Sequence, residues 1–372
     1  MENAAPPVEN PAPVSVRSPQ ARQRRWPGRL LLIACATWLT FVALHRLLTG
    51  RFWLWLLPDL VPPIFYVAAP LLLFALTPLA GRLRRRCALL LTASLLLGIG
   101  HSGLNLPGDP GTPPPGALRV FSWNTLYWHQ DDDPDRFYRF LKDQRADIYL
   151  LQEYLGWVDD QPRQMNDLTR LRREFPGYHL AVAGEQLTLS RFPIIATPPV
   201  GLAAALTPGS PWRTTFDLAK TLRTDLRVGS SVLSVYNVHI PAQAVLNENP
   251  FLASFYTELR DRSSRRDAQY QGLRADLDRN RNPVLVSGDF NTTAAMGELT
   301  WLSDHLTSAN EVNSSLYPTS WYAGILPLWQ LDWTFTRSIK IHAYDLLDPV
   351  GLSDHRAQSL LIQPVPEISG TG

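Results

Sequence analysis

The chain has 372 residues and a formal net charge of only +2, but that charge is distributed unevenly. Residues 1–117 hold eleven basic and four acidic residues, so 11 − 4 gives +7, while the remaining 24 basic and 29 acidic residues give −5. The C-terminal part therefore lacks the basic excess of a dedicated DNA-binding domain. Both cysteines, Cys35 and Cys87, precede residue 88, which excludes a disulfide or a thiolate metal site from this part.

The N-terminal region has the pattern of a membrane anchor. Residues 1–28 are polar, basic and Pro-rich, and we expect a disordered cytoplasmic tail. Apolar stretches follow at 30–49, 52–81 and 87–106, and each contains the roughly 20 residues that cross about 30 Å of hydrocarbon. We therefore predict about three transmembrane helices in 29–106. The middle one would span at 63–81, because Pro58, Asp59, Pro62 and Pro63 interrupt the earlier half.

The basic clusters at 17–29 and 82–86 predict the orientation of these helices. Lys and Arg stay on the cytoplasmic side, and both clusters can do so only if the chain crosses three times. The rest of the chain would then be extracytoplasmic, in a multi-pass protein of the inner or cell membrane whose partner is the lipid bilayer. If the middle stretch does not span, the following domain is cytoplasmic. No pattern indicates a protein partner. Residues 107–117 are rich in Pro and Gly and predict a semi-rigid linker.

Short β-rich runs alternate with amphipathic stretches from residue 118 onward, which predicts an α/β domain over 118–364 and a flexible tail at 365–372. The expected strands are 118–123, 147–152, 178–183, 222–228, 232–238, 283–288, 332–336, 339–344 and 358–362. The expected helices are 134–145, 161–175 and 252–280. We expect the charged clusters 131–133, 159–160 and 260–266 to be solvated surface.

Polar residues follow several of these strands, at the edge where layered α/β folds usually carry their sites. They are Asn124, Glu153, His239, Asp289, Asn291, Asp332, Asp354 and His355. Hydrolysis of a phosphate ester needs a hard cation held by carboxylates, a base that activates water, and donors for the phosphate oxygens. This set supplies each of those groups, so the sequence predicts a metal-assisted phosphate site.

Six motifs occur in a characteristic order: Trp-Asn-Thr, Leu-Gln-Glu, Asn-Val-His, Gly-Asp-Phe-Asn, Leu-Asp-Trp-Thr-Phe and Ser-Asp-His. In this the chain resembles the endonuclease/exonuclease/phosphatase superfamily, as a membrane-anchored bacterial-type member. That superfamily includes pancreatic-type deoxyribonucleases, abasic-site endonucleases, sphingomyelinases and inositol-polyphosphate phosphatases. The resemblance covers about 118–364 and implies a four-layer sandwich, in which two packed mixed β-sheets are flanked by helices.

The resemblance also implies a metal site. Glu153 would be the principal Mg²⁺ ligand, with Mn²⁺ as the alternative ion. Asn124 would support the metal and the phosphate from beside it. Asp354 would lie in or next to the metal shell.

The remaining roles that the resemblance implies belong to the chemical step. Asp289 would position or deprotonate the attacking water, and Asn291 would hydrogen-bond the phosphate. His239 would donate to a non-bridging oxygen as charge builds up. His355 would act as general acid/base or phosphate clamp, with its ring oriented by Asp332.

The function that we expect is a membrane-anchored, metal-dependent hydrolase of phosphodiesters or phosphomonoesters. Its substrate would be a lipid headgroup, a nucleotide or a nucleic acid. One alternative is an extracytoplasmic endonuclease or exonuclease, although no basic loop for a DNA groove is evident. The other is a catalytically silent, membrane-tethered binding module of the same fold.

Overall fold

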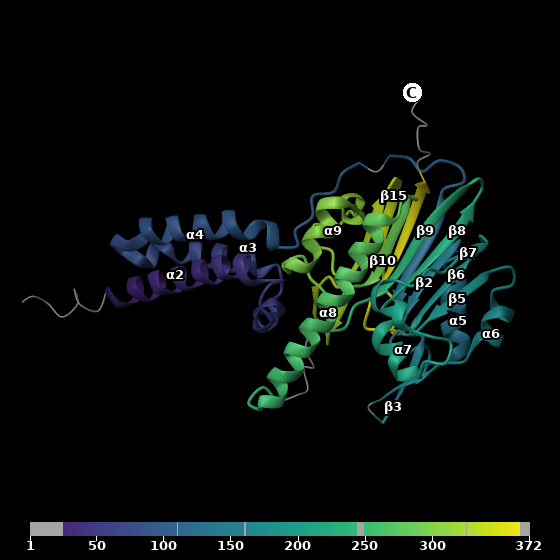
Figure 1. Cartoon of the computed structure of the whole chain (residues 1–372). Helices are drawn as coiled ribbons and strands as arrows, with labels where there is room; N and C mark the ends of the chain where they lie inside the picture. The colour runs from purple at the N-terminus through teal and green to yellow at the C-terminus, as the bar shows by residue number, and fades with distance from the viewer. Residues whose placement is uncertain (1–24, 110, 160, 244–248, 325, 365–372) are drawn as a thin grey trace, which may run out of the picture.

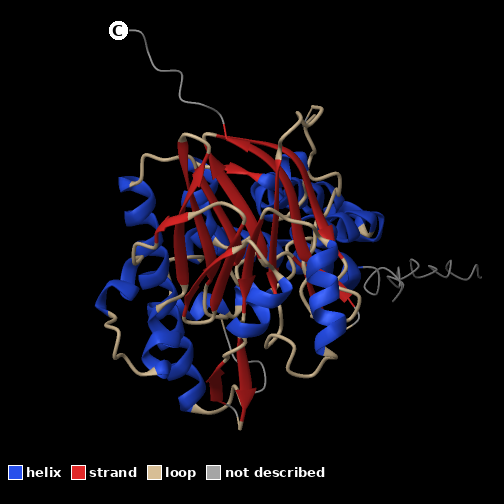
Figure 2. Cartoon of the chain, turned by 90° about the vertical axis from the view of Figure 1, so that its right-hand side faces the viewer, coloured by secondary structure: helices blue, strands red, loops and turns tan. Residues whose placement is uncertain are grey.

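The computed structural model describes residues 25–109, 111–159, 161–243, 249–324 and 326–364. Most of the tail predicted at 1–28, and all of the tail predicted at 365–372, lie outside these residues. A group of N-terminal helices projects from a larger domain (Figure 1), which is built around β-sheets with helices beside them (Figure 2).

Two six-stranded mixed sheets form the centre of the large domain. The first has the order β15 (Ile339–Leu347), β16 (Ala357–Pro364), β1 (Leu118–Asn124), β2 (Ile148–Gln152), β6 (Gln186–Ser190) and β5 (His179–Ala183). The second has the order β11 (Thr307–Ser308), β14 (Asp332–Arg337), β10 (Val284–Asp289), β9 (Ser231–His239), β8 (Thr221–Val228) and β7 (Ile194–Ala196). The pairs β1/β2 and β9/β10 are parallel, and the other pairs are antiparallel.

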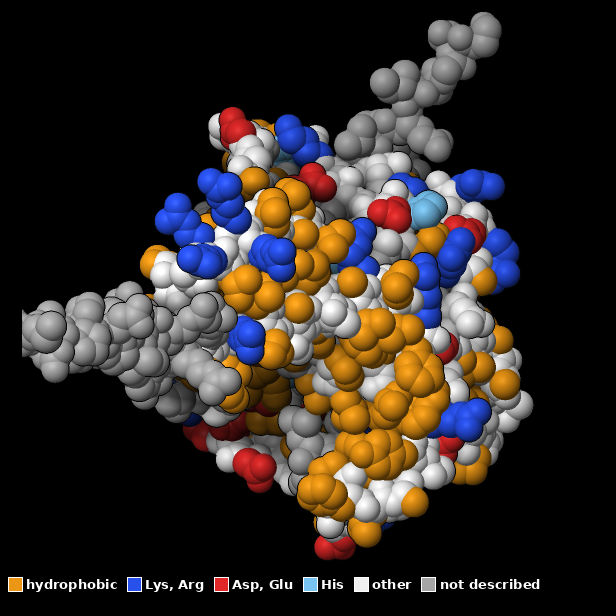
Figure 3. Space-filling model, turned by 90° about the vertical axis from the view of Figure 1, so that its left-hand side faces the viewer, with side chains coloured by type: hydrophobic (Ala, Val, Ile, Leu, Met, Phe, Trp, Pro, Cys, Tyr) orange, Lys and Arg blue, Asp and Glu red, His pale blue; other side chains and the backbone are white. Residues whose placement is uncertain are grey.

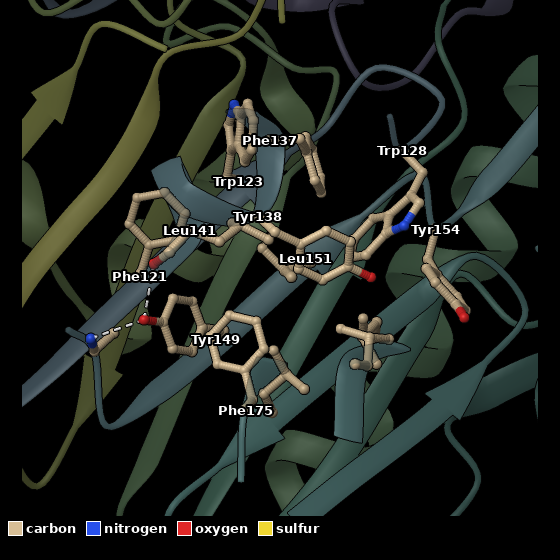
Figure 4. Packing of buried hydrophobic residues seen from close by; sticks show 14 of the residues in the cluster. Phe121, Trp123, Trp128, Phe137, Tyr138, Leu141, Tyr149, Leu151, Tyr154 and Phe175 are labelled. Atoms are coloured by element: carbon tan, nitrogen blue, oxygen red, sulfur yellow. Dashed lines mark hydrogen bonds between the residues drawn. The ribbon is translucent and has the colours of Figure 1, made fainter. Parts of the chain in front are cut away.

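The domain has four layers, which are two sheets with helices on the outer face of each. A cluster of buried side chains fills each of the three spaces between these layers. Between the sheets, Leu150 and Leu360 of the first sheet share a cluster with Val235 and Leu285 of the second. The outer face of the first sheet packs its aromatic side chains against α5 (Pro134–Asp143) and α6 (Leu168–Glu174), as Figure 4 shows. The outer face of the second packs against α8 (Ala253–Arg279) and α9 (Thr300–His305). The predicted sandwich of two mixed sheets flanked by helices is therefore confirmed.

The smaller elements lie around this sandwich. Two hairpins stand apart from the main sheets, β3 (Leu155–Val158) with β4 (Gln161–Gln164), and β12 (Trp321–Ala323) with β13 (Leu326–Trp329). The helix α7 is Trp212–Leu218, and the 3₁₀ turns of the domain are η5 (Gly201–Ala205), η6 (Gly297–Leu299) and η7 (Ala309–Val312).

All nine expected strands are present, with ends that differ by a few residues. The helix expected at 161–175 is wrong in its first half, because residues 161–164 pair with β3 and only α6 is helical. The apolar spacing of a helix is outweighed there by strand pairing with the preceding segment.

The N-terminal helices are α2 (Arg25–Leu48), α3 (Phe65–Ala75) and α4 (Arg84–Gly98), joined by the 3₁₀ turns η1 (Trp53–Leu56), η2 (Pro58–Leu60) and η3 (Thr77–Leu83) and followed by η4 (Ile99–His101). In the described part of the chain one helix, Trp26–Leu48, is long and apolar enough to cross a membrane. A second crossing is counted only if 53–60 and 65–75, bent by 58°, form one span. The middle stretch is not one helix over 63–81, because its helical part ends at Ala75.

The segment predicted as a linker lies on the domain at its start. Asn105 donates its backbone N–H to the Leu316 carbonyl at 2.8 Å, and Gly108 donates to the Glu311 carbonyl at 2.6 Å. The start of this segment therefore contacts the domain, and its role as a spacer stays a prediction.

A hydrogen-bonded row of polar side chains crosses between the sheets beyond the apolar cluster. Asn237 of β9 donates its amide to the carbonyls of Leu151 (3.0 Å) and Leu187 (3.1 Å), and accepts from the Gln152 amide at 2.6 Å. Thr334 donates to Gln358 at 2.8 Å. These bonds join the second sheet to the first, and buried hydrogen bonds of this kind favour one arrangement of the two sheets.

We expect Asn237→Leu to lower the free energy of unfolding by roughly 1–3 kcal/mol, because it removes the bond that Gln152 donates to Asn237 and the two bonds that Asn237 donates to the Leu151 and Leu187 carbonyls. Denaturant unfolding of the full chain in detergent measures this. Ser231→Ala, at the exposed start of the same strand, is the control and should change little. Equal stability of Asn237→Leu and the parent would contradict the role of this row.

Candidate active site

The predicted site residues come from both sheets and meet at one edge. Asn124, His239 and Asp289 are the last residues of β1, β9 and β10, and Glu153 directly follows β2. Because β1/β2 and β9/β10 are parallel pairs, their carboxyl ends lie at the same edge. Asp332 begins the antiparallel strand β14 and is the direct neighbour of Asp289 in register.

Gly288 is required for the position of Asp289. Its φ is +148°, and a Cβ built on it would lie 2.0 Å from the Val238 carbonyl oxygen of the adjacent strand. Only glycine allows β9 and β10 to approach so closely just before their last residues. This explains why the Gly-Asp pair of the motif occurs here.

Asp289 is the centre of the cluster. Its Oδ1 accepts the backbone N–H of Asn291 at 2.8 Å, and its Oδ2 accepts the amides of Asn124 (3.0 Å) and Asn291 (3.2 Å). The Nε2 atoms of His239 and His355 lie 3.6 and 3.7 Å from the same Oδ2. Two imidazoles and two amides therefore converge on one carboxylate.

Glu153 shares the Asn124 amide with Asp289. The Asn124 amide donates to Oε1 of Glu153 at 3.0 Å, and the backbone N–H of Tyr127 donates to Oε2 at 3.0 Å. Glu153 has a φ of +58°, a conformation that costs energy and is typical of functional sites. Burial raises the pKa of Glu153, and a bound cation would offset that desolvation.

His355 and Asp332 form a buried pair. The distance from His355 Nδ1 to Asp332 Oδ2 is 2.8 Å, which leaves Nε2 directed toward Asp289. Burial lowers the pKa of His355, but Asp332 and Asp289 outweigh it and raise the pKa to about 10. His355 is thus a proton donor at neutral pH, as a phosphate clamp or general acid requires.

His239 has a partner that the sequence did not indicate. Its Nδ1 lies 3.1 Å from Oε1 of Glu185, which also forms an ion pair with Lys220, and both partners are buried. Burial raises the pKa of Glu185, but His239 and Lys220 outweigh it and hold the pKa at about 2. Burial likewise lowers the pKa of His239, and Glu185 and Asp289 raise it to about 9. Each histidine of the site is therefore held by a carboxylate.

The donors present suit a hard divalent cation. Carboxylate oxygens come from Glu153, Asp289 and Asp354, and Oδ1 of Asp354 is buried without a hydrogen-bond partner among the described residues. Its Oδ2 accepts the indole N–H of Trp321 at 2.9 Å. Single ligand atoms of Asp289, Asp332 and His355 lie within 4.8 Å of one another, so among the described residues this group could hold an ion, and it includes neither Glu153 nor Asp354.

The side chain of Asn124 makes contacts that orient its neighbours. Its Nδ2 donates to both Glu153 and Asp289, while its Oδ1 accepts the backbone N–H of Leu126 at 3.1 Å. Asn291 donates to the Ile240 carbonyl at 2.9 Å and has a φ of +46°. Both amides thus fix the carboxylates from the side, where they could also face a phosphate.

Comparison with known proteins gives a consistent match for the domain. The model of the Endonuclease/Exonuclease/phosphatase family matches residues 121–355. Similar solved structures include an endonuclease/exonuclease/phosphatase family protein from Leptotrichia buccalis C-1013-b, with a TM-score of 0.47 and 16% identity over 66% of this chain and 100% of that chain. The human Nocturnin catalytic domain with bound sulfate anion has a TM-score of 0.43 and 16% identity, covering 69% of this chain and 96% of that chain. Sphingomyelinase C from Streptomyces griseocarneus has a TM-score of 0.42 and 19% identity, covering 67% and 99%. No curated protein sequence matches the chain.

We expect Glu185→Gln to destabilise the protein by roughly 3–5 kcal/mol, because it leaves Lys220 buried without its partner. Unfolding of the full chain by denaturant in detergent measures this loss. The double variant Glu185→Gln/Lys220→Met removes both charges and should recover part of it. A single variant as stable as the parent would contradict the role of the pair.

The pH dependence of this loss has a defined sign. The pKa of Glu185 falls from 4.5 to about 2 on folding, so its contribution is complete above pH 4.5 and is lost as the pH falls toward 2. The difference in unfolding free energy between the parent and Glu185→Gln should therefore shrink below pH 4.5. A difference that grows in acid would contradict the assignment.

Proposed function

Because the chain belongs to the endonuclease/exonuclease/phosphatase family, whose members are phosphoesterases and nucleases, we propose that it is a membrane-anchored, Mg²⁺-dependent phosphoesterase. The observation that carries the proposal is the convergence of Asn124, His239 and His355 on Asp289, with Glu153 beside them. No packing requirement brings two protonated imidazoles and several carboxylates to one partly open edge.

Each residue has a role that follows from its contacts. Mg²⁺, or Mn²⁺ in its place, supplies charge that neutralises the phosphate and acidifies a water, and Glu153 and Asp354 would hold it. Asp289 accepts the proton of the attacking water, since its Oδ2 is the common acceptor of the cluster. His239 and Asn291 donate to non-bridging oxygens, and His355, oriented by Asp332, donates to the phosphate or its leaving group.

The membrane part of the proposal is supported by the surface and geometry of the N-terminal helices. Many large apolar side chains point outward there, among them Leu30, Ile33, Leu47, Leu72, Leu79, Leu89 and Leu96, each at least 60% exposed. Figure 3, which views the molecule from the side of these helices, shows hydrophobic side chains gathered over this face. Such an extended apolar surface fits contact with lipid.

The order of the helix ends fits three passes of the chain between the same two ends, of which one or two have the length and composition of a membrane span in the described part of the chain. Gly28, near the start of α2, lies against the carbonyl of Ala80, whereas Arg46 near its end donates to the Leu97 carbonyl at 3.1 Å. Arg29 and the basic cluster 82–86 are therefore at the end of the helices away from the domain, which favours an extracytoplasmic active site. The 24 residues of α2 give about 36 Å of helix, enough to span, while the 15 of α4 give about 22 Å and need η4 to reach the interface.

Specific observations bear on the two alternative functions. The rings of Tyr127 and Trp157 stack at 5.5 Å beside Glu153, and such a pair could receive a base, which favours a nucleotide or nucleic-acid substrate over a lipid headgroup. A silent binding module of the same fold is disfavoured, because every expected catalytic side chain is present and held by a partner.

We expect Glu153→Gln to abolish metal-dependent turnover and His355→Ala to lower kcat by roughly 100- to 1,000-fold, with the fold intact. The full chain in detergent is assayed on bis-p-nitrophenyl phosphate, p-nitrophenyl phosphate, plasmid DNA and sphingomyelin, with Mg²⁺ and with EDTA. Asp278→Asn, exposed on α8, is the control. Full activity of either site variant would refute the assignment, and the preferred substrate would separate the candidates.

We expect Asp332→Asn to shift the alkaline limb of the kcat/KM profile to lower pH. The Asp332 carboxylate raises the pKa of His355, so its removal lets His355 lose its proton at lower pH. A pH–rate profile of the variant measures the shift, with Asp345→Asn, exposed on β15, as the control. An unmoved limb would show that His355 is not the group that titrates.

A further inference from the structure

The N-terminal helices contact the same loops that carry catalytic residues. His45 Nε2 lies 2.6 Å from the Ala295 carbonyl oxygen, and Gly297 donates its N–H to Thr49 Oγ1 at 3.0 Å. Both domain residues belong to the loop that follows Asn291. On the other side of the site, Trp329 donates its indole N–H to the Leu60 carbonyl at 3.1 Å, three residues before Asp332. The helices are therefore in direct contact with the framework of the site.

The contact at Gly297 is a close approach of two backbones. A Cβ built on Gly297 would lie 2.7 Å from the Thr49 carbonyl oxygen and 3.0 Å from the Thr49 carbonyl carbon, and neither can move aside independently. Gly50, next to Thr49, faces the Gly297 backbone in the same way. A methyl group added at Gly297 must therefore push the Thr49–Gly50 backbone at the end of α2 away from the segment that follows Asn291.

Arg266 of α8 lies directly behind this loop. We expected it in a solvated charged cluster, but its side chain is wholly buried. Its guanidinium donates to the carbonyls of Pro241 (2.6 Å) and Asn291 (3.1 Å) and to Thr292 Oγ1 (2.6 Å). Pro241 follows His239 by two residues, so one guanidinium holds both catalytic loops. Charge on the helix surface is an unreliable guide where a loop covers it.

Arg266 is in turn held by Glu298, the residue after Gly297. Glu298 Oε1 accepts from Arg266 Nε at 3.2 Å and from Nη2 at 3.0 Å. Burial lowers the pKa of Arg266, but Glu298 and Tyr270 outweigh it and raise the pKa, with a smaller contribution from Asp59 of η2. The side chain of Asp59 is 1% exposed, and neither of its oxygens has a hydrogen-bond partner among the described residues. The Arg266–Glu298 pair thus connects the residue next to the Thr49–Gly297 contact with both catalytic loops.

On the basis of the proposed function, we propose that Arg266 is a positioning residue. Through Glu298 and the Thr49–Gly297 contact, it makes the geometry of the His239 and Asn291 loops depend on how the N-terminal helices are seated. The helices are then a part of the catalytic centre as well as an anchor, and a change in the bilayer that shifts them would change turnover.

The first test needs no enzymatic activity. Hydrogen exchange is measured on the full chain in phospholipid nanodiscs for the parent, Gly297→Ala and Gly100→Ala. Gly100 lies in η4, and a Cβ there meets no atom within 4 Å, so it is the matched control. We expect Gly297→Ala to raise exchange at least threefold in two separate segments, 239–243 and 289–293. A rise confined to 294–298, or equal exchange in both variants, overturns the proposal.

The second test separates positioning from general stability. Glu298→Gln, Arg266→Lys and Gly297→Ala should each lower kcat at least tenfold with KM within about twofold. Lysine keeps the charge but lacks the planar donor set that reaches four acceptor atoms, so it should not rescue kcat. Because the Gly297 contact acts through the pair, Gly297→Ala/Glu298→Gln should lose no more kcat than the worse single variant. Multiplicative losses, or rescue by lysine, overturn the proposal.

The two tests distinguish the inference from the proposed function. If no phosphate ester is cleaved by the parent but exchange responds in both segments, the mechanical link stands and the assigned chemistry fails. If hydrolysis is found but exchange and kcat are insensitive to Gly297→Ala, the chemistry stands and the link fails.

Discussion

The hydrogen-bonded row between the two sheets is the constraint on which the site depends. Along β9 the side chains that face the other sheet are Val235, then Asn237, then His239, and along β10 they are Leu285, Ser287 and Asp289. Val235 and Leu285 form an apolar layer that excludes water. Asn237 and Ser287 form a polar layer that fixes how the sheets pair, and His239 and Asp289 of the candidate site form the layer after it. Because strand side chains alternate with a period of two, a slip of one residue would bury the reactive groups on the wrong face.

This arrangement explains why residues that are far apart in the chain can cooperate. The first sheet supplies Asn124 and the turn that holds Glu153, and the second supplies His239, Asp289 and Asp332. Neither sheet contains a complete set. The Asn124 amide, which donates to a carboxylate from each half, lies where the two sets meet. The geometry of the candidate site therefore depends on how the sheets pack, and a substitution in their interface can disturb it without touching any of these residues.

The sequence predicted much of the fold and of the site because both depend on local patterns. Strand periodicity followed by a polar residue identified the edge at which Asn124, Glu153, His239 and Asp289 converge. Glu185 and Arg266 could not be found in this way. Glu185 lies in a hairpin turn and Arg266 in a charged helical run, positions that normally face water, and only contacts with distant segments bury them. The same limit applies to residues 161–164, whose partner strand outweighed their helical spacing.

The short connection between helices and domain restricts how the active site can search for substrate. Asn105 and Gly108 are tied to the domain directly after η4, so the domain has little freedom to swing. If the helices lie in a bilayer, the site keeps a constant height and orientation above the lipid, and encounters with membrane-borne molecules become a two-dimensional process. A tether of this kind replaces bulk concentration by a local one that is set by geometry. Substrates would then be ranked by their reach above the bilayer as well as by their chemistry.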